Sequence, residues 1–319
     1  MLGPDNRGIA CSDLLGGFDA GAWACSAATE TESDVGAEPA IFPGARQARP
    51  VIVVLHGELQ LHPRRDPHAD FADLYGLFYA RSSAMGWLTE AVEGGAKGGF
   101  WGMNEAEYDA SPGRSPHEIA WCQVDLTNPD ATGRVPLQPL LTCLGDSVAR
   151  IGTAQISAIQ IALPALEPGR SSSDSALRAL TGDDSCWFFD SDPQSTTRIR
   201  MTLDGGRHPR IHAAAPSMLE WVMRAQRVAS FDSPLPPDDD LDPPNPYFED
   251  DTWPGPPQHR TTMRGTLAEW SLDALGWLAA LVAAAASHHG VSAPWMLTVK
   301  RVDTSGDKPR AEEALSPAS

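Results

Sequence analysis

The sequence predicts an α+β protein with mixed sheets flanked by helices, and three observations support this class. Residues 51–62 and 117–128 are predicted strands, in which the side chains from Leu55 onward and over 117–128 alternate apolar and polar, as half-buried strands do. Longer segments such as 135–152 instead repeat apolar residues at the spacing of an amphipathic helix. The chain has 319 residues, of which 42% are hydrophobic, and this is enough to fill a substantial core.

The first half of the chain predicts helices between three strands. Residues 66–95 repeat aromatic and apolar side chains at helical spacing, and Gly86 and the Gly94–Gly95 pair are expected to break this region into pieces. Gly152 is expected to end the next helix. The predicted elements, in order, are strand 51–62, helical pieces within 66–95, strand 117–128, helix 135–152 and strand 156–166.

The second half predicts a similar alternation of strands and helices. Ser217-x-x-Glu220 and Thr266-x-x-Glu269 both match the capping box that begins many helices. The apolar window 274–287 is shorter than the roughly 20 residues that a bilayer span requires, so it predicts a buried helix. The predicted elements are strands 185–192 and 197–206, helix 216–230, helix 266–290 and strand 293–302.

These elements predict two similar α+β halves that form a pseudo-dimer. In each half a helix end is followed by a glycine, Gly152 or Gly290, and then by an alternating strand. The polar composition of the residues before, between and after the halves predicts flexible segments there. The expected organisation is an N-terminal arm at 1–48, an α+β half at 49–166, a connector at 167–184, a second half at 185–303 with an insertion at 231–259, and a loose tail at 304–319.

Charge and cysteine usage limit the partners and the compartment. The formal net charge is −18, with 42 acidic against 24 basic residues, so nucleic acid and membrane surfaces are not expected as partners. Five dispersed cysteines and no secretory signal predict a cytoplasmic protein with free thiols, and the Ala-, Gly- and Arg-rich composition is typical of bacteria with GC-rich genomes. The one local concentration of positive charge lies at Arg198, Arg200, Arg207 and Arg210.

His56 and Glu58 are candidates for a metal or catalytic site. They share one face of the predicted strand, about 7 Å apart at Cα, and a further ligand is expected from His117 or Asp125 if that strand is adjacent. The alternative is that these side chains form only the solvent-facing side of a sheet. No cofactor or bound metal is needed to explain the pattern.

Gly145-Asp146-Ser147 resembles the first sequence block of the GDSL (SGNH) hydrolases, in which the serine is the nucleophile. The resemblance implies a catalytic role for Ser147. It covers about a dozen residues, and the downstream Gly-x-Asn-Asp and Asp-x-x-His blocks of that family are absent. A serine without a positioned base is an ordinary alcohol, so the alternative is a polar turn of a helix.

The acidic, Pro-rich insertion at 231–259 is the most unusual segment of the chain. Its composition predicts an extended, polyproline-like loop, and loops of this length in compact domains are often functional. Its aromatic residues are expected to anchor the loop on a basic protein surface or a second subunit. The expected partner-binding residues are Asp238, Asp239, Asp240, Asp242, Tyr247, Phe248 and Trp253.

Two functions therefore remain open. The first is a non-catalytic binding or assembly protein that acts through the acidic loop, because the sequence contains no complete catalytic constellation. The second is an enzyme whose site is assembled from residues that are distant in the sequence. A metal-dependent enzyme would use His56, Glu58, His117 and Asp125, and a serine hydrolase would use Ser147.

Overall fold

The computed structural model describes residues 50–63, 73–92, 95–110, 117–127, 135–165, 196–225, 229–231, 255–256 and 258–302. All of these belong to the second of two units into which the chain divides, Met1–Arg46 and Gln47–Ser319. The predicted arm, connector, strand 185–192 and tail lie outside the described residues, as do residues 232–254 of the acidic insertion.

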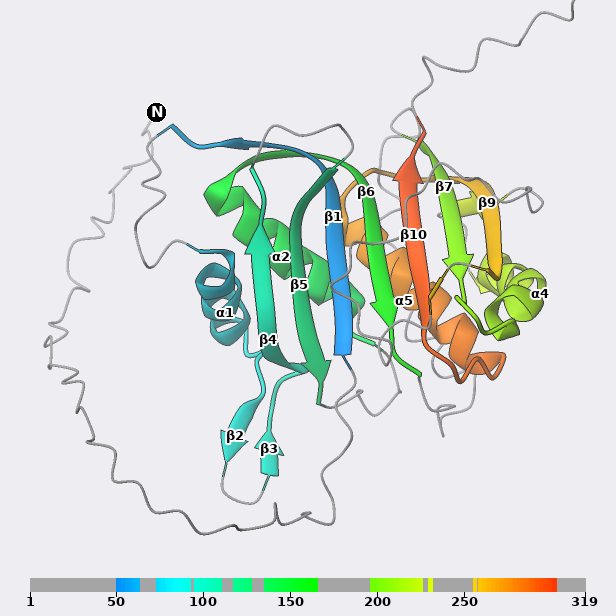
Figure 1. Ribbon diagram of the computed structural model, residues 1–319, viewed down its shortest axis with the longest axis horizontal. Coiled ribbons are helices and arrows are strands. Elements are labelled where there is room, and N and C mark those ends of the chain that lie inside the picture. The colour runs from blue at the N-terminus through cyan, green and yellow to red at the C-terminus, as the bar shows by residue number, and fades with distance from the viewer. Residues whose placement is uncertain are drawn as a thin grey trace, which may run out of the picture. The chain divides into compact units, whose positions relative to one another are not determined.

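Eight strands form one antiparallel sheet in the order β4-β5-β1-β6-β10-β7-β9-β8 (Figure 1). A separate hairpin is formed by β2 (Glu90–Val92) and β3 (Gly95–Lys97). The α+β class is confirmed, whereas the strand pairs of the described sheets are antiparallel and not mixed. The strands are β1 Pro50–Leu61, β4 Trp101–Tyr108, β5 His117–Leu126, β6 Gly152–Leu163, β7 Thr197–Asp204, β8 Ala229–Phe231, β9 Arg260–Leu267 and β10 Trp295–Arg301.

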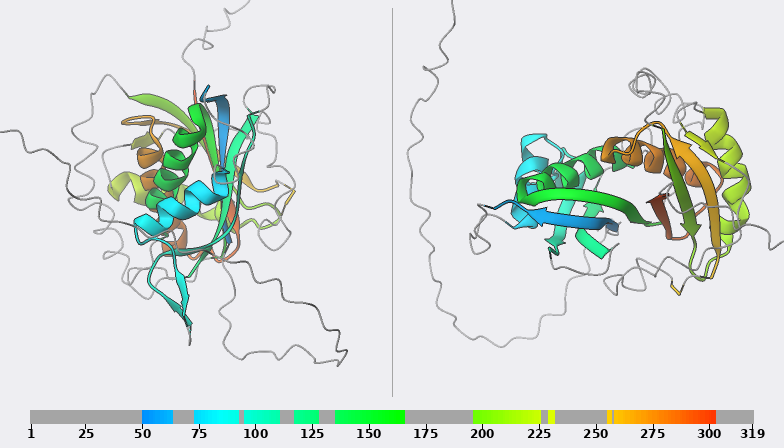
Figure 2. Two further views of the ribbon diagram at one scale, coloured as in Figure 1. Left: turned by 90° about the vertical axis from the view of Figure 1, so that its left-hand side faces the viewer. Right: turned by 90° about the horizontal axis from the view of Figure 1, so that it is seen from above.

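Four described helices cover one face of the sheet, and none of the described helices lies on the opposite face, which we call the helix-free face (Figure 2). They are α1 Leu74–Ala84, α2 Leu137–Ile151, α4 Arg210–Ala225 and α5 Leu272–His288. Helix α2 packs against α5, and α1 and α4 flank this central pair. The core lies between the sheet and these helices, because alternate strand residues such as Val53, Ile159 and Val299 are fully buried there.

Helix α5 is apolar on almost every side, and its buried residues run from Ala274 to Ala286. This confirms the buried helix that the apolar window predicted. A helix can be apolar all round only when neighbours surround it. Here α2, α4 and the sheet provide that surrounding.

Both predicted capping boxes are wrong. Helix α4 begins at Arg210, directly after a turn at Pro209, so Ser217 lies inside the helix beside Pro216. Thr266 belongs to β9, and the N-cap of α5 is Ser271, whose hydroxyl accepts the Ala274 amide at 3.1 Å. The Ser/Thr-x-x-Glu spacing also occurs inside helices and strands, so it cannot locate a helix start without the adjoining turn.

Strand β4 was not predicted, because no element was expected between the helical pieces ending at 95 and the strand beginning at 117. The strand carries Glu105 and Glu107 and has a β-bulge between Met103 and Glu105. Such charges and bulges are typical of edge strands, where they oppose pairing with another chain. The opposite edge, β8, has only three residues, so both sheet edges are protected from edge-to-edge association.

Candidate functional surface on the helix-free face

The helix-free face is built from the strand residues that alternate with the core residues. On β7, Ile199, Met201 and Leu203 belong to the core under the helices, so Arg200 and Thr202 face the other way. In Figure 1 the sheet stands in front of its helices, so this face is turned toward the viewer. The side chains on it are therefore the candidates for a binding surface or an active site.

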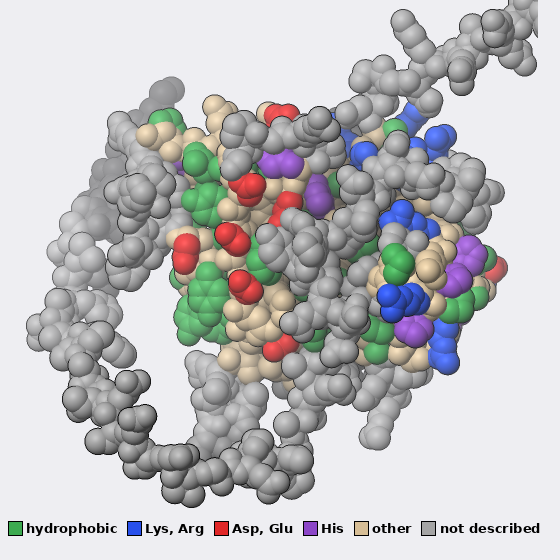
Figure 3. All heavy atoms as spheres, in the orientation of Figure 1, with side chains coloured by type: hydrophobic (Ala, Val, Ile, Leu, Met, Phe, Trp, Pro, Cys, Tyr) green, Lys and Arg blue, Asp and Glu red, His purple; other side chains and the backbone are tan. Residues whose placement is uncertain are grey.

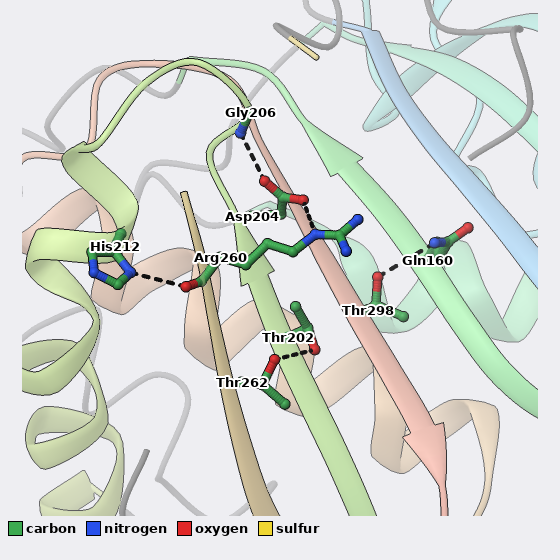
Figure 4. A network of polar contacts seen from close by, with 8 residues as sticks. All are labelled: Gln160, Thr202, Asp204, Gly206, His212, Arg260, Thr262 and Thr298. Atoms are coloured by element: carbon green, nitrogen blue, oxygen red, sulfur yellow. Dashed lines mark hydrogen bonds and ion pairs between the residues drawn. The ribbon is translucent and has the colours of Figure 1, made fainter. Parts of the chain in front are cut away.

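A buried polar row crosses four adjacent strands of this face. The row consists of Gln160 on β6, Thr298 on β10, Thr202 on β7 and Thr262 on β9, which occupy successive register positions. Gln160 donates to the Thr298 hydroxyl at 3.5 Å, and the hydroxyls of Thr202 and Thr262 lie 3.1 Å apart (Figure 4). All four side chains are buried, and these hydrogen bonds reduce the cost of burying them.

A buried ion pair lies beside the polar row, where β7 ends. Arg260 Nε donates to Asp204 at 2.7 Å, and the amide of Gly206 donates to the other carboxylate oxygen at 2.8 Å. His212 on α4 donates through Nδ1 to the carbonyl of Arg260 at 2.9 Å (Figure 4). The Asp204 carboxylate therefore ties the β7–α4 turn to the start of β9.

The next row of paired residues on this face carries charged side chains on several adjacent strands. Lys300 on β10 lies opposite Arg200 on β7, and Arg200 lies opposite Arg264 on β9. Arg198 precedes Arg200 by two positions on β7 and therefore lies on the same face. We call these four residues the basic row. The full register row runs through Glu118, His56, Ala158, Lys300, Arg200 and Arg264.

The basic run expected from the sequence is only partly retained. Arg198 and Arg200 lie at alternate positions of one strand, as predicted, but Arg210 lies at the start of α4 and donates to the Ser292 hydroxyl at 2.6 Å. Lys300 and Arg264 were missed, because only the pairing of β7 with β10 and β9 places them beside Arg200.

Acidic side chains occupy the opposite end of the same face. Glu105 and Glu107 lie on the edge strand β4, and Glu118 lies at the start of β5. Burial raises the pKa of Glu118, and the negative charges of Asp109 and Glu107 raise it further. In Figure 3 acidic side chains gather over β4 and β5, whereas lysine and arginine gather over β10, β7 and β9. The helix-free face is therefore divided into an acidic and a basic region.

His56 lies between these two regions. Its Nε2 donates to Gln160 Oε1 at 2.8 Å. Burial lowers the pKa of His56, the Gln160 hydrogen bond acts in the opposite direction, and the nearby charge of His117 lowers it further. His117 lies opposite Gly57 on the neighbouring strand, which places it near enough to His56 for its charge to act on that imidazole.

The other two residues of the predicted four-residue site lie apart from this pair. Glu58 is exposed and lies opposite Gln155 on β6. Asp125 lies opposite Pro50, six residues from His56 along β1, which corresponds to about 20 Å. Within the part of the chain that the structure describes, no group of three or more His, Cys, Asp or Glu side chains is arranged to hold a metal.

Ser147 lies within α2 and not at the end of a strand. Its hydroxyl is buried and donates to the carbonyl of Cys143, one helical turn earlier, at 2.8 Å. A surface groove of about 460 Å³ adjoins it between α1 and α2, and there Asp146 pairs with Arg81 at 2.7 Å. The Ser147 hydroxyl is thus engaged with its own helix.

The two described cysteines are both buried and free. Burial raises the pKa of Cys143 to about 11, although hydrogen bonds with Ser82 and Ser147 act in the opposite direction. Burial also raises the pKa of Cys122. Because the thiolate is the reactive form, neither thiol is activated as a nucleophile near neutral pH.

The expected partner-binding residues lie outside the described residues. They are Asp238, Asp239, Asp240, Asp242, Tyr247, Phe248 and Trp253. The strands that flank this segment are described: β8 ends at Phe231, and β9 begins at Arg260.

Comparisons of the chain with protein-family models, with curated proteins and with solved structures find no match. Among the described helices, none is long and apolar enough to cross a membrane. The fold and surface define an α+β protein whose charge-divided sheet face carries none of the described helices.

Proposed function

We propose that this protein is a non-catalytic binding or assembly protein of the cytoplasm. It acts through the acidic, Pro-rich segment 231–259, which contacts a basic protein surface. The observation that carries this proposal is the charge-divided sheet face, because separated charged regions favour protein association and specify its orientation. Ser147, Cys122 and Cys143 offer no activated nucleophile among the described residues, which supports a non-catalytic role.

The test replaces residues 234–257 with a Gly/Ser linker of equal length. The control replaces the C-terminal residues 304–319 in the same way. We expect the first variant to keep its melting temperature and to lose association, as measured by native mass spectrometry, while the control keeps both. Unchanged association in the first variant would exclude a role for the acidic segment.

We also propose that the chain contains two related halves that form a pseudo-dimer. Leaving aside the separate β2–β3 hairpin between α1 and β4, the first half has the order β1-α1-β4-β5-α2-β6, and the second has β7-α4-β8-β9-α5-β10, so each matches the β-α-β-β-α-β order of a split βαβ motif. The sheet order supports this proposal, because β4-β5-β1-β6 and β10-β7-β9-β8 are the same strand order read in opposite directions. In an experimental structure we expect β1, β5 and β6 to superpose on β7, β9 and β10; failure of that superposition would refute the relationship.

An enzyme with a site around His56 is the second candidate. The observation that favours it is that His117 lies close enough to His56 for its charge to lower the His56 pKa, since imidazole nitrogens are suitable metal ligands. Glu58 and Asp125 would contribute only after a rearrangement of the strands. Metal analysis of untagged protein tests this candidate: stoichiometric Zn, Fe or Mn that is lost in His56→Ala supports it, and metal-free protein excludes the metal-dependent form.

A further inference from the structure

Two imidazoles lie beside each other where helix α4 and strand β9 begin. The ring centroids of His212 and His259 are 6.5 Å apart. His212 is an exposed residue in the first turn of α4, and the half-buried His259 directly precedes β9. Strand β9 is the fourth strand from β1 in the sheet order, so this pair is separate from the site around His56.

The hydrogen bonds of His212 determine which of its ring nitrogens can bind a ligand. Nδ1 lies 2.9 Å from the carbonyl oxygen of Arg260 (Figure 4) and 2.8 Å from the hydroxyl of Thr261. A carbonyl oxygen only accepts, so Nδ1 carries the proton of the neutral ring and Nε2 keeps its lone pair. Metal-binding histidines are usually oriented in this way, by a carbonyl or carboxylate on the other ring nitrogen.

The backbone that carries the two imidazoles is held in place by hydrogen bonds. The His259 amide donates to the carbonyl of Gly206 at 3.2 Å, and the His259 carbonyl accepts the amide of Gly205 at 3.1 Å. The buried Asp204 carboxylate accepts from Arg260 and from the Gly206 amide, which fixes the same junction. Ligands that are positioned before an ion arrives lose less conformational entropy when it binds.

The spacing of the rings is close to that of two imidazoles on one metal ion. Imidazole nitrogens bind Zn²⁺ at about 2.0–2.1 Å, so two imidazoles on one tetrahedral ion have ring centroids roughly 5.3 Å apart. The observed 6.5 Å is about 1 Å longer, and a change in the side-chain torsion angles of His259 would close this difference without moving the backbone. Imidazole nitrogens suit Zn²⁺, Cu²⁺ and Ni²⁺, whereas Ca²⁺ and Mg²⁺ prefer oxygen ligands.

We propose that His212 and His259 form a binding site for a divalent transition-metal ion. Water or another exchangeable ligand completes the coordination, because no group of three His, Cys, Asp or Glu side chains in the described part of the chain is arranged to hold a metal. The exposed, cationic Arg207 and Arg210 of the same junction lower the affinity, so binding is reversible. The ion joins the start of α4 to the start of β9 and stabilises the folded state, because the unfolded chain does not hold the two rings together.

The test uses untagged full-length protein that has been treated with EDTA and freed of the chelator. The variants are His212→Gln and His259→Gln, and the matched control is His208→Gln, which removes an exposed histidine from the β7–α4 turn. Circular dichroism and the melting temperature without metal establish that each protein is folded. Isothermal titration with Zn²⁺ measures binding, and electron paramagnetic resonance of the Cu²⁺ complex counts the nitrogen ligands.

We expect one Zn²⁺ per chain at this site in the wild type and in the control. Binding should be at least tenfold weaker in His212→Gln and in His259→Gln. Zn²⁺ should raise the melting temperature of the wild type and the control, and this rise should be lost in both variants. The Cu²⁺ spectrum of the wild type should show coupling to two imidazole nitrogens.

Three results would overturn the inference. The first is a wild type that binds no Zn²⁺, or that binds it no more tightly than the two variants do. The second is a loss of binding in His56→Ala with unchanged binding in His212→Gln, which would assign the ion to the site around His56. The third is an equal loss in His208→Gln, which would show unspecific binding by surface histidines. None of these results bears on the acidic segment, whose role is measured by association.

Discussion

Helices α2 and α5 approach closely enough that one added methyl group should force them apart. A Cβ atom at Gly276 on α5 would lie 2.6 Å from the Gln138 Cα and 3.0 Å from the Leu137 carbonyl oxygen, both on α2. Backbone atoms cannot rotate away, so we expect a cost near the upper end of the roughly 1–3 kcal/mol range for overpacking. Alanine recovers about 1 kcal/mol through its higher helix propensity. Gly276→Ala should therefore destabilise the protein by about 2 kcal/mol.

Gly145→Ala is the matched control on the facing helix. Its Cβ would lie 2.4 Å from Leu272 Cδ1, which is the end of a flexible side chain, so a rotamer change costing about 1 kcal/mol relieves the contact. The gain in helix propensity should offset this cost, and stability should stay within about 0.5 kcal/mol of the wild type. Urea unfolding followed by circular dichroism measures both changes. Equal stability of the two variants would refute the close helix contact.

Three further predictions concern single side chains. Asp204→Asn should lower stability by about 3–5 kcal/mol in urea unfolding, because it leaves the largely buried charge of Arg260 without its partner; a loss below about 1 kcal/mol would show that the pair is hydrated. Ser271→Ala should lower the free energy of unfolding by about 1 kcal/mol, because Ser271 is the N-cap of α5, whereas Ser217→Ala inside α4 should change it by less than about 0.5 kcal/mol. A larger loss at Ser217 than at Ser271 would instead support the capping box predicted at Ser217. Burial keeps the pKa of His56 in the folded protein below its ordinary value of 6.5, so the folded state binds fewer protons than the unfolded state as the pH falls. The stability linked to His56 is complete above pH 6.5 and is lost at lower pH, so the melting temperature of His56→Gln should fall less than that of the wild type between pH 7.5 and 5. Equal falls in the two proteins would contradict this assignment.

Hydrophobic periodicity was sufficient to locate most of the central elements. The strand predicted at 51–62 is β1 at Pro50–Leu61, and the helix predicted at 135–152 is α2 at Leu137–Ile151. Helix α2 is strongly patterned because one side packs on the core and the other does not, whereas β1 begins with an apolar run that is buried on both faces from Val51 to Leu55 and alternates only after it. The polar edge strand β4 lacked this pattern, since glutamates occupy its outer face and a bulge shifts its register.

The candidate surface could not be predicted, because it depends on strand pairing. His56 reaches Gln160 from 104 residues away, and Lys300 meets Arg200 across β10 and β7. Side-chain alternation indicates which face a residue occupies, but it does not indicate which strand will be its neighbour. The arginine run therefore identified half of the basic row, and only the sheet order supplied Lys300 and Arg264.

The most direct test of the account is a zero-length carbodiimide cross-link between the acidic segment and a lysine of the protein that it contacts. The chain itself has only three lysines, so an amide formed with a carboxylate of residues 232–254 can be assigned by mass spectrometry. Mixing ¹⁴N- and ¹⁵N-labelled protein before cross-linking distinguishes contacts within one chain from contacts between two copies. The account predicts cross-linked peptides that join this segment to a second polypeptide, either another copy of the chain or a different protein; same-label peptides from within one chain alone would contradict it.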